Sequence, residues 1–213
     1  MLDGFAYFCN MNILFPERTS EHLLTATDEI GTLLEENCLK YRDIRHTIFI
    51  ATWLQMKDRF SYWRNVIERG FAFSTHYLHN SDYLRLIIIN EENCNAANLD
   101  NEVLKAIMLH ELGHLLNHPP LEVEPNNLYC IQNKIPYCRE EHQRIAQLNN
   151  LKKEIYTDAY AKQHGYTDTT LGGFAKYNVL FQTNVGTYAE RVEAINSNEQ
   201  YIGTVRPIER QGF

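Results

Sequence analysis

The sequence has no cluster of basic residues and no long apolar run. Its 20 Lys and Arg and 27 Asp and Glu residues are intermixed and give a formal net charge of −7, so no segment is suited to follow the phosphates of a nucleic acid. The most apolar window, Ile44 to Leu54, is shorter than the ~20 residues of a membrane-spanning helix and contains Arg45 and His46. We therefore expect neither a nucleic-acid partner nor a membrane span.

Residues 1–20 also lack the features of a secretory signal peptide. No basic segment precedes their apolar residues, and no small-residue cleavage site follows them. This predicts a cytoplasmic protein. The many Asn, Tyr and Ile residues are typical of AT-rich genomes. The cytoplasm could therefore be that of a host cell, if the chain is a phage protein or an exported effector.

The five cysteines are irregularly spaced and form no C-x-x-C pair. This pattern predicts reduced, buried thiols in a reducing compartment rather than a disulfide framework. An alternative is that Cys130, Cys138 and His142 form a small second metal site.

Repeats, low-complexity tracts and Gly/Ser linkers are absent too, which predicts one domain over 1–213. We divide it into a helix and strand region (1–80), a core (81–195) and an irregular tail (196–213). The expected elements are a helix from Ser20 to Leu34, a strand over 47–53 or a helix continuing towards Trp63, a short strand over 71–76, a strand over 83–90, a helix from Asp100 to His118, a loop over 121–136, a helix over 139–164, and shorter helices over 170–181 and 187–195. This order predicts an α+β fold.

One motif combines histidine and glutamate at helical spacing: His110-Glu-Leu-Gly-His114. Side chains four residues apart share one face of a helix and lie ~6 Å apart along its axis. Both imidazoles can therefore reach one ion at ~2.0–2.1 Å. Glu111 would point beside that ion, where it could hold a water molecule and act as the general base. The alternative without a function is two histidines on the surface of an amphipathic helix.

A catalytic zinc ion needs a third protein ligand and an open fourth position. His118 lies ~12 Å along the helix axis from His110, too far for both to share an ion on one straight helix. Glu154 is the better candidate, because Asp158 follows it by four residues and could accept the second N–H of a ligand imidazole. We therefore expect one zinc ion bound by His110, His114 and Glu154, with Asp158 orienting a ligand.

These motifs resemble those of the gluzincin zinc peptidases, especially the HtpX and CAAX-protease type. HELGH is followed at Glu154 by E-x-x-x-D-A-x-A. LDNEVLKAIMLHELGH is similar to the active-site helix of that type, DAYAKQHGY to its stretch after the third ligand, and TYAERVEAI to its closing helix. LIIIN ahead of HELGHLLNH also resembles the ImmA/IrrE group of small cytoplasmic peptidases. The resemblance covers roughly residues 84–195.

The resemblance implies a zincin-like metallopeptidase domain with an active-site helix, a small mixed sheet and a mainly helical remainder. It places Arg191 on the arginine of the closing helix. The chain departs from the HtpX type in lacking membrane helices, and Val185-Gly186 stands where that type has His-Pro. The group that polarises the substrate carbonyl therefore stays open among four candidates: Tyr160, His164, Tyr188 and Arg191.

Together these features predict a zinc-dependent metalloendopeptidase acting on proteins or peptides. By analogy with gluzincins, the exposed edge of the strand over 83–90 would bind an extended substrate as an added strand. Three alternatives stay open. They are a regulatory protease of the ImmA/IrrE kind that cleaves one partner, a non-catalytic domain with a closed zinc site using His118 or Cys138, and a hydrolase of non-peptide bonds.

Overall fold

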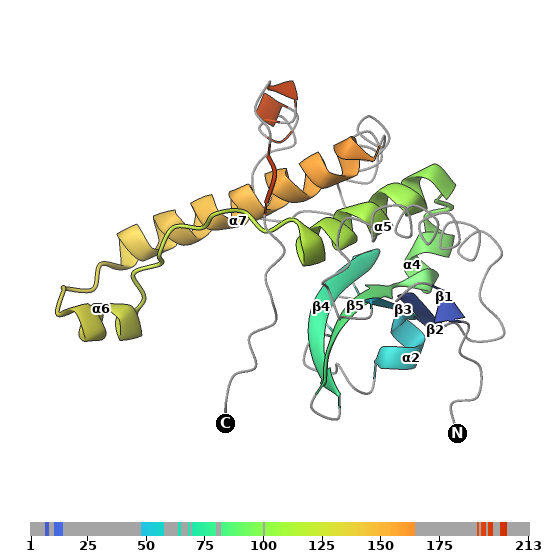
Figure 1. Cartoon of the computed structure of the whole chain (residues 1–213), viewed down its shortest axis with the longest axis horizontal. Coiled ribbons are helices and arrows are strands. Elements are labelled where there is room, and N and C mark those ends of the chain that lie inside the picture. The colour runs from blue at the N-terminus through green and yellow to red at the C-terminus, as the bar shows by residue number, and fades with distance from the viewer. Residues whose placement is uncertain are drawn as a thin grey trace.

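The described residues form an α+β fold in which helices pack on a mixed sheet (Figure 1). The computed structural model describes residues 7–8, 11–14, 48–57, 70–79, 82–99, 101–164 and 201–203, together with single positions at 64, 68, 191, 193, 194, 196 and 197. The α+β class expected from the order of elements is confirmed.

The sheet has five strands in the order β1-β2-β3-β5-β4. The central strands β2 (Met11–Leu14), β3 (Ile48–Thr52) and β5 (Asp82–Ile89) are parallel to one another. The outer strands β1 (Tyr7–Phe8) and β4 (Ala72–His79) each run antiparallel to their neighbour. The expected mixed sheet is thus present, and the short strand expected over 71–76 extends to His79.

Strand β5 lies inside the sheet, because it pairs with β3 on one side and with β4 on the other. Its β-branched residues favour a strand, and consecutive side chains point to opposite faces. Ile87 and Ile89 enter the hydrophobic core, and Leu86 and Ile88 are also buried. The prediction that this strand offers an exposed edge is therefore wrong. Strand β4 is the outermost strand on that side among the described residues.

Two long helices agree with the expected ones. Helix α5 (Asn101–Leu116) ends ahead of Pro119 and Pro120, which cannot continue a helix. Helix α7 (Arg139–Gln163) spans the segment expected to be helical. The strand expected over 47–53 is confirmed as β3, and the short helix α2 (Trp53–Met56) follows it directly. The continuation of a helix towards Trp63 lies outside the described residues.

Two short helices were not expected, and an asparagine caps each of them. Asn90 accepts a hydrogen bond from the backbone N–H of Asn93 at the start of α4 (Glu91–Ala96). Asn126 does the same for Tyr129 at the start of α6 (Asn127–Asn133), within the segment that we expected to be a loop. Asparagine is favoured both in turns and at helix N-caps, which explains the error.

The hydrophobic core lies where α5 packs against the sheet and against α7. Almost the whole of α5 is buried, including Met108 at 1% and Leu112 at 0% exposure. Ile50 and Ile87 come from the sheet and Tyr160 from α7. A helix that is apolar nearly all round requires cover on all sides. Its two histidines therefore lie within a packed structure.

Asn117, just after α5, joins three parts of the chain. Its side-chain amide donates to the carbonyl oxygens of Tyr156 (2.6 Å) and Tyr201 (3.1 Å), and its Oδ1 accepts from the backbone N–H of Gly203 (2.5 Å). Asn117 is 7% exposed, so these bonds satisfy a buried polar group. The end of α5 is thereby fixed both to α7 and to residues 201–203.

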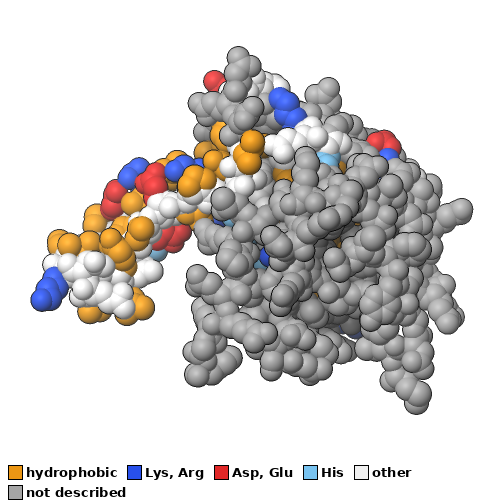
Figure 2. All heavy atoms as spheres, in the orientation of Figure 1, with side chains coloured by type: hydrophobic (Ala, Val, Ile, Leu, Met, Phe, Trp, Pro, Cys, Tyr) orange, Lys and Arg blue, Asp and Glu red, His pale blue; other side chains and the backbone are white. Residues whose placement is uncertain are grey.

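Helix α6 and the first half of α7 project away from the sheet as an arm, which we define as residues 121–150 (Figures 1 and 2). The buried amide of Asn149 exchanges two hydrogen bonds with the backbone of Glu122 and so holds the two sides of the arm together. The arm carries several exposed apolar side chains, among them Ile131 at 74% and Leu128 at 64%.

Several predictions fall outside the described residues. They concern the helix from Ser20 to Leu34, the helix over 170–181, the cap at Asp100, Tyr188, Cys9, Cys38 and the tail beyond 203. Within the closing segment, positions 191, 193, 194 and 196 are helical. None of the described helices combines the length and apolarity needed to cross a bilayer. The single domain stays a prediction.

Candidate metal centre

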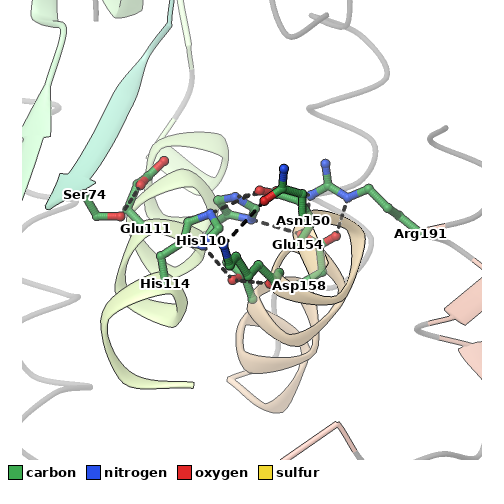
Figure 3. A network of polar contacts seen from close by, with 10 residues as sticks. Ser74, His110, Glu111, His114, Asn150, Glu154, Asp158 and Arg191 are labelled. Carbon is green, nitrogen blue, oxygen red and sulfur yellow. Dashed lines mark hydrogen bonds and ion pairs between the residues drawn. The ribbon is translucent and has the colours of Figure 1, made fainter. Parts of the chain in front are cut away.

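Helices α5 and α7 bring the three expected ligands together (Figure 3). His110 and His114 come from α5, and Glu154 faces them from α7. One nitrogen from each imidazole and one oxygen of the carboxylate all lie within 4.8 Å of one another. The side chains are 9%, 26% and 17% exposed in the same order, so the cluster is largely shielded from water.

The distances within this cluster suit a metal ion. His110 Nε2 lies 3.4 Å from Glu154 Oε2, and His114 Nε2 lies 3.5 Å from Glu154 Oε1. Two atoms bound to one tetrahedral zinc ion at ~2.0–2.1 Å would be about 3.3–3.4 Å apart. Two histidines and one glutamate are also a donor set found in catalytic zinc sites, so the residues present fit such an ion. A group that could hold a metal ion is thus present at the three expected residues.

Asp158 lies behind His110, as expected. The Oδ1 atom of Asp158 is 3.0 Å from His110 Nδ1. Arg191 donates a 2.7 Å hydrogen bond from Nε to one carboxylate oxygen of Asp158 and another of 2.7 Å from Nη2 to the other. Arg191 Nη2 also lies 3.6 Å from Glu154 Oε2. Arg191 thus connects the closing segment to the cluster. Its guanidinium contacts the carboxylates of both Asp158 and Glu154. Arg191 as a carbonyl-polarising group stays a prediction.

The two histidines have opposite electrostatic environments. Burial by itself lowers the pKa of His110, but hydrogen bonds to Asp158 and Glu154 outweigh it and raise the pKa to about 10. Burial and the neighbouring charge of His110 lower the pKa of His114. Without a metal, His110 is therefore the positively charged imidazolium of the pair at neutral pH, and His114 is the neutral imidazole.

The carboxylates of α7 are held ionised by the same contacts. Burial raises the pKa of Glu154, but the bond to His110 and the charges of His114, His110 and Arg191 prevail and lower the pKa to about 2. The pKa of Asp158 is also lowered, because His110 and Arg191 outweigh its burial. Glu154 is thus available as an anionic ligand at neutral pH.

Glu111 points from α5 towards β4, on the other side from Asp158 (Figure 3). Its Oε2 accepts a 2.6 Å hydrogen bond from the hydroxyl of Ser74 on β4. The charge of Glu111 also acts on His114, whose pKa it raises in part. The role of Glu111 as the base stays a prediction. Ser74 was missed, because nothing in the local sequence marks a serine 37 residues away as its partner.

Thr157 was also missed. It lies on α7 between the ligand Glu154 and Asp158, and its Oγ1 is 3.1 Å from Nδ1 of His114. Opposite it, Gly113 leaves room for the helices to approach: a Cβ atom there would lie 3.0 Å from the Cα and O atoms of Thr157. The sequence signal was present in the Gly of HELGH, but its partner on α7 could not be identified.

The remaining carbonyl-polarising candidates are only partly described. Tyr160 is 4% exposed and belongs to the hydrophobic core, where its ring packs on His164 at 4.5 Å between centroids. The Nδ1 atom of His164 lies 2.8 Å from the carbonyl oxygen of Tyr160. Tyr188 lies outside the described residues. A catalytic role for any of the three stays a prediction.

The alternative second metal site is wrong. Among the described residues, only His110, His114 and Glu154 form a group that could hold a metal. Cys130 is buried and its thiol faces the carbonyl oxygen of Pro125. Cys138 is exposed, so the prediction of a buried thiol holds for Cys94 and Cys130 but not for Cys138. His118 is not part of the triad either, as we expected from its distance along the helix axis from His110.

Comparison with known proteins identifies no relative of this chain. No protein-family model, no curated protein and no solved structure matches the chain. The functional argument therefore depends on the residues themselves.

Proposed function

We propose that this protein is a zinc-dependent peptidase of the gluzincin kind, with His110, His114 and Glu154 as the ligands. The observation that carries the proposal is the triad itself, in which one ligand atom from each of the three residues lies within 4.8 Å of the others. The described residues contribute three ligands, which is the number found in catalytic zinc sites.

Each residue has a distinct task in this proposal. The zinc ion, when bound, supplies Lewis-acid activation of a water molecule and of the substrate carbonyl. Glu111 accepts a proton from the attacking water and later donates it to the leaving amine. Ser74 holds the carboxylate of Glu111 in place until substrate arrives. Asp158 and Arg191 keep the ligand side chains oriented and ionised.

The zincin-like fold is part of the same proposal. Its support is the arrangement of the active-site helix α5, which packs against the sheet and contacts β4 and β5. Strand β4 takes the place of β5 as the proposed substrate platform, since it carries Ser74 beside Glu111 and no described strand pairs with its outer edge. An extended peptide added there would have its backbone next to the base.

The experiment combines metal analysis with cleavage mapping. Purified wild-type protein should contain about one zinc ion per chain and cleave peptides in a denatured proteome. Glu111→Gln should keep the zinc and lose activity by at least ~100-fold, the lower end for a lost general base. His114→Ala should lose the zinc. Wild-type activity in Glu111→Gln would remove the base, and full metal content in His114→Ala would remove the ligand.

The arm favours a second candidate function, a regulatory protease that recognises one folded partner. Its exposed apolar side chains, including Ile131 and Leu128, form the kind of surface that binds proteins. Cleavage mapping in a native lysate separates the two functions. Many cut proteins support a general peptidase, whereas one cut protein supports the regulatory protease.

A further inference from the structure

Thr157 makes two hydrogen-bond contacts that together define the direction of its hydroxyl. Its Oγ1 lies 2.7 Å from the carbonyl oxygen of Lys153 and 3.1 Å from Nδ1 of His114. A carbonyl oxygen only accepts, and the contact with it is the shorter of the two. The hydroxyl proton therefore points to Lys153, and a lone pair of Oγ1 faces the imidazole.

We propose that Thr157 is a positioning residue that fixes the tautomer of His114. Its oxygen accepts the Nδ1–H of the ring, which leaves Nε2 without a proton and turned towards Glu154 Oε1, 3.5 Å away. This inference rests on the proposed metal site, where Nε2 is the donor atom. Asp158, the next residue, has the corresponding contact with His110. Consecutive residues of α7 thus orient the two imidazoles.

The residues that contact the two imidazoles, Asp158 at His110 and Thr157 at His114, differ in charge. Asp158 is a carboxylate, whereas Thr157 is neutral. A second carboxylate behind His114 would make the centre more negative and would disfavour the negative charge that develops on a substrate carbonyl. With a neutral acceptor, His114 is oriented without that cost. Three ligands of charge −1 in total then leave a zinc centre formally at +1.

The packing of α5 on α7 makes the contact possible. Gly113 has no side chain at the point where its Cβ would lie 3.0 Å from the backbone of Thr157. The helices therefore approach closely enough for a side chain as short as threonine to reach the ring of His114. Thr157 is 1% exposed, and its bond to Lys153 restricts its χ1 angle. The acceptor is thus fixed before any metal binds.

Thr157 could instead serve only to fill the contact between the two helices, and two substitutions separate these roles. Thr157→Val keeps the shape of the side chain but removes the acceptor. Thr157→Ser keeps the hydroxyl but removes the methyl group. If Thr157 orients His114, the valine variant should bind Zn²⁺ about 10- to 100-fold more weakly, as is typical for loss of such a partner. The serine variant should stay within about threefold of wild type.

The measurement is the Zn²⁺ dissociation constant, obtained by competition with a chromophoric chelator. It does not depend on peptidase activity, so a protein that binds zinc without cleaving peptides would remove the proposed function and leave this inference intact. A valine variant that binds Zn²⁺ as tightly as wild type, with a serine variant that binds it more weakly, would overturn the role of Thr157 and indicate packing alone.

A second readout needs no metal. The ¹⁵N chemical shifts of the imidazole of His114, assigned with a His114→Gln variant, report which ring nitrogen carries the proton. We expect Nδ1–H in wild type and in Thr157→Ser, and a mixture of tautomers in Thr157→Val. An Nε2–H tautomer in the wild-type protein would contradict the inference, whatever the metal affinity proves to be.

Discussion

Asp158 lies between Arg191, the only described arginine at the candidate metal centre, and His110, one of the two histidines of that centre. Arg191 binds both oxygens of Asp158, and Asp158 in turn binds Nδ1 of His110. Asp158 is 2% exposed, so its charge depends on these partners. The chain from Arg191 to His110 is continuous, and a change at its outer end should therefore affect the ligand.

The protonation of His110 predicts how zinc affinity depends on pH. Its pKa is raised to about 10 without a metal, so zinc must displace a proton from Nε2 at any lower pH. The pKa of His114 is lowered, so this ring adds no such cost. The zinc association constant should therefore rise about tenfold per pH unit between pH 6 and 8. Chelator competition at three pH values measures this slope. A slope of zero would show that His110 is already deprotonated.

Removal of Arg191 should cost much more stability than removal of a surface arginine. Arg191→Ala removes one of the two positively charged partners of the buried Asp158 and leaves it only His110, and loss of one member of a buried ion pair typically costs about 3–5 kcal/mol. Arg144 provides the matched control, since it also makes two 2.8 Å bonds to one carboxylate, that of Glu141, but on an exposed face. Arg144→Ala should change the unfolding free energy little. Urea denaturation measures both, and equal losses would contradict the structural role of Arg191.

At this scale the sequence predicts contacts within a helix better than contacts between elements. The spacing of His110 and His114, and of Glu154 and Asp158, follows from helical periodicity alone. Ser74 and Thr157 lie 37 and 43 residues from the partners they bond. No local pattern specifies those pairs, because the fold creates them.

Helix α5 combines structural and chemical roles on one element. Its apolar residues fill the space between the sheet and α7, so the histidines are held by packing as well as by hydrogen bonds. The arm, by contrast, has many exposed apolar side chains. Substitutions in α5 should therefore lower the unfolding free energy much more than substitutions of exposed residues on the arm.

Met108→Ala and Ile131→Ala form a pair that measures this difference. Met108 is 1% exposed in the core, and its truncation should lower the unfolding free energy by about 2–5 kcal/mol. Ile131 is 74% exposed on the arm, and its truncation should cost no more than about 0.5 kcal/mol. Thermal or urea unfolding gives both values. A large loss for Ile131→Ala would mean that another part of the protein covers this side of the arm.

The long elements could be predicted from the sequence and the short ones could not. Helices α5 and α7 are long enough for their apolar periodicity and their ends to be recognised. Helices α4 and α6 are six and seven residues long, and their local signal is an asparagine that also suits a turn. Strand β5 was wrongly predicted to have an exposed edge, because the order of strands in a sheet depends on contacts between segments that are distant in the sequence.

For the whole molecule, a metal ion would act as a cross-link between α5 and α7. Their contact is one of the most extensive between elements of the described structure. A ligand that binds only the folded state stabilises it by about 2.7 kcal/mol at a free concentration 100 times its Kd. For a protein of this size that corresponds to a rise in Tm of about 5–10 °C.

Differential scanning fluorimetry with and without Zn²⁺ tests this stabilisation. The wild-type protein should show the rise and lose it when EDTA is added. His114→Ala, which lacks one of the proposed ligands, should show neither change. A similar rise in His114→Ala would indicate that zinc stabilises the protein without this ligand and would contradict the proposed site.

The bonds of Asn117 have a consequence for the integrity of the protein. Residues 201–203 are tied to the end of α5 by its amide, and Arg191 is tied to α7 by Asp158. Both attachments join the closing segment to parts of the chain far earlier in the sequence. These noncovalent contacts would remain available to join the two fragments if the chain were cut once within 165–190. The two bonds to Asp158 would then hold the arginine of the second fragment beside the candidate metal centre of the first.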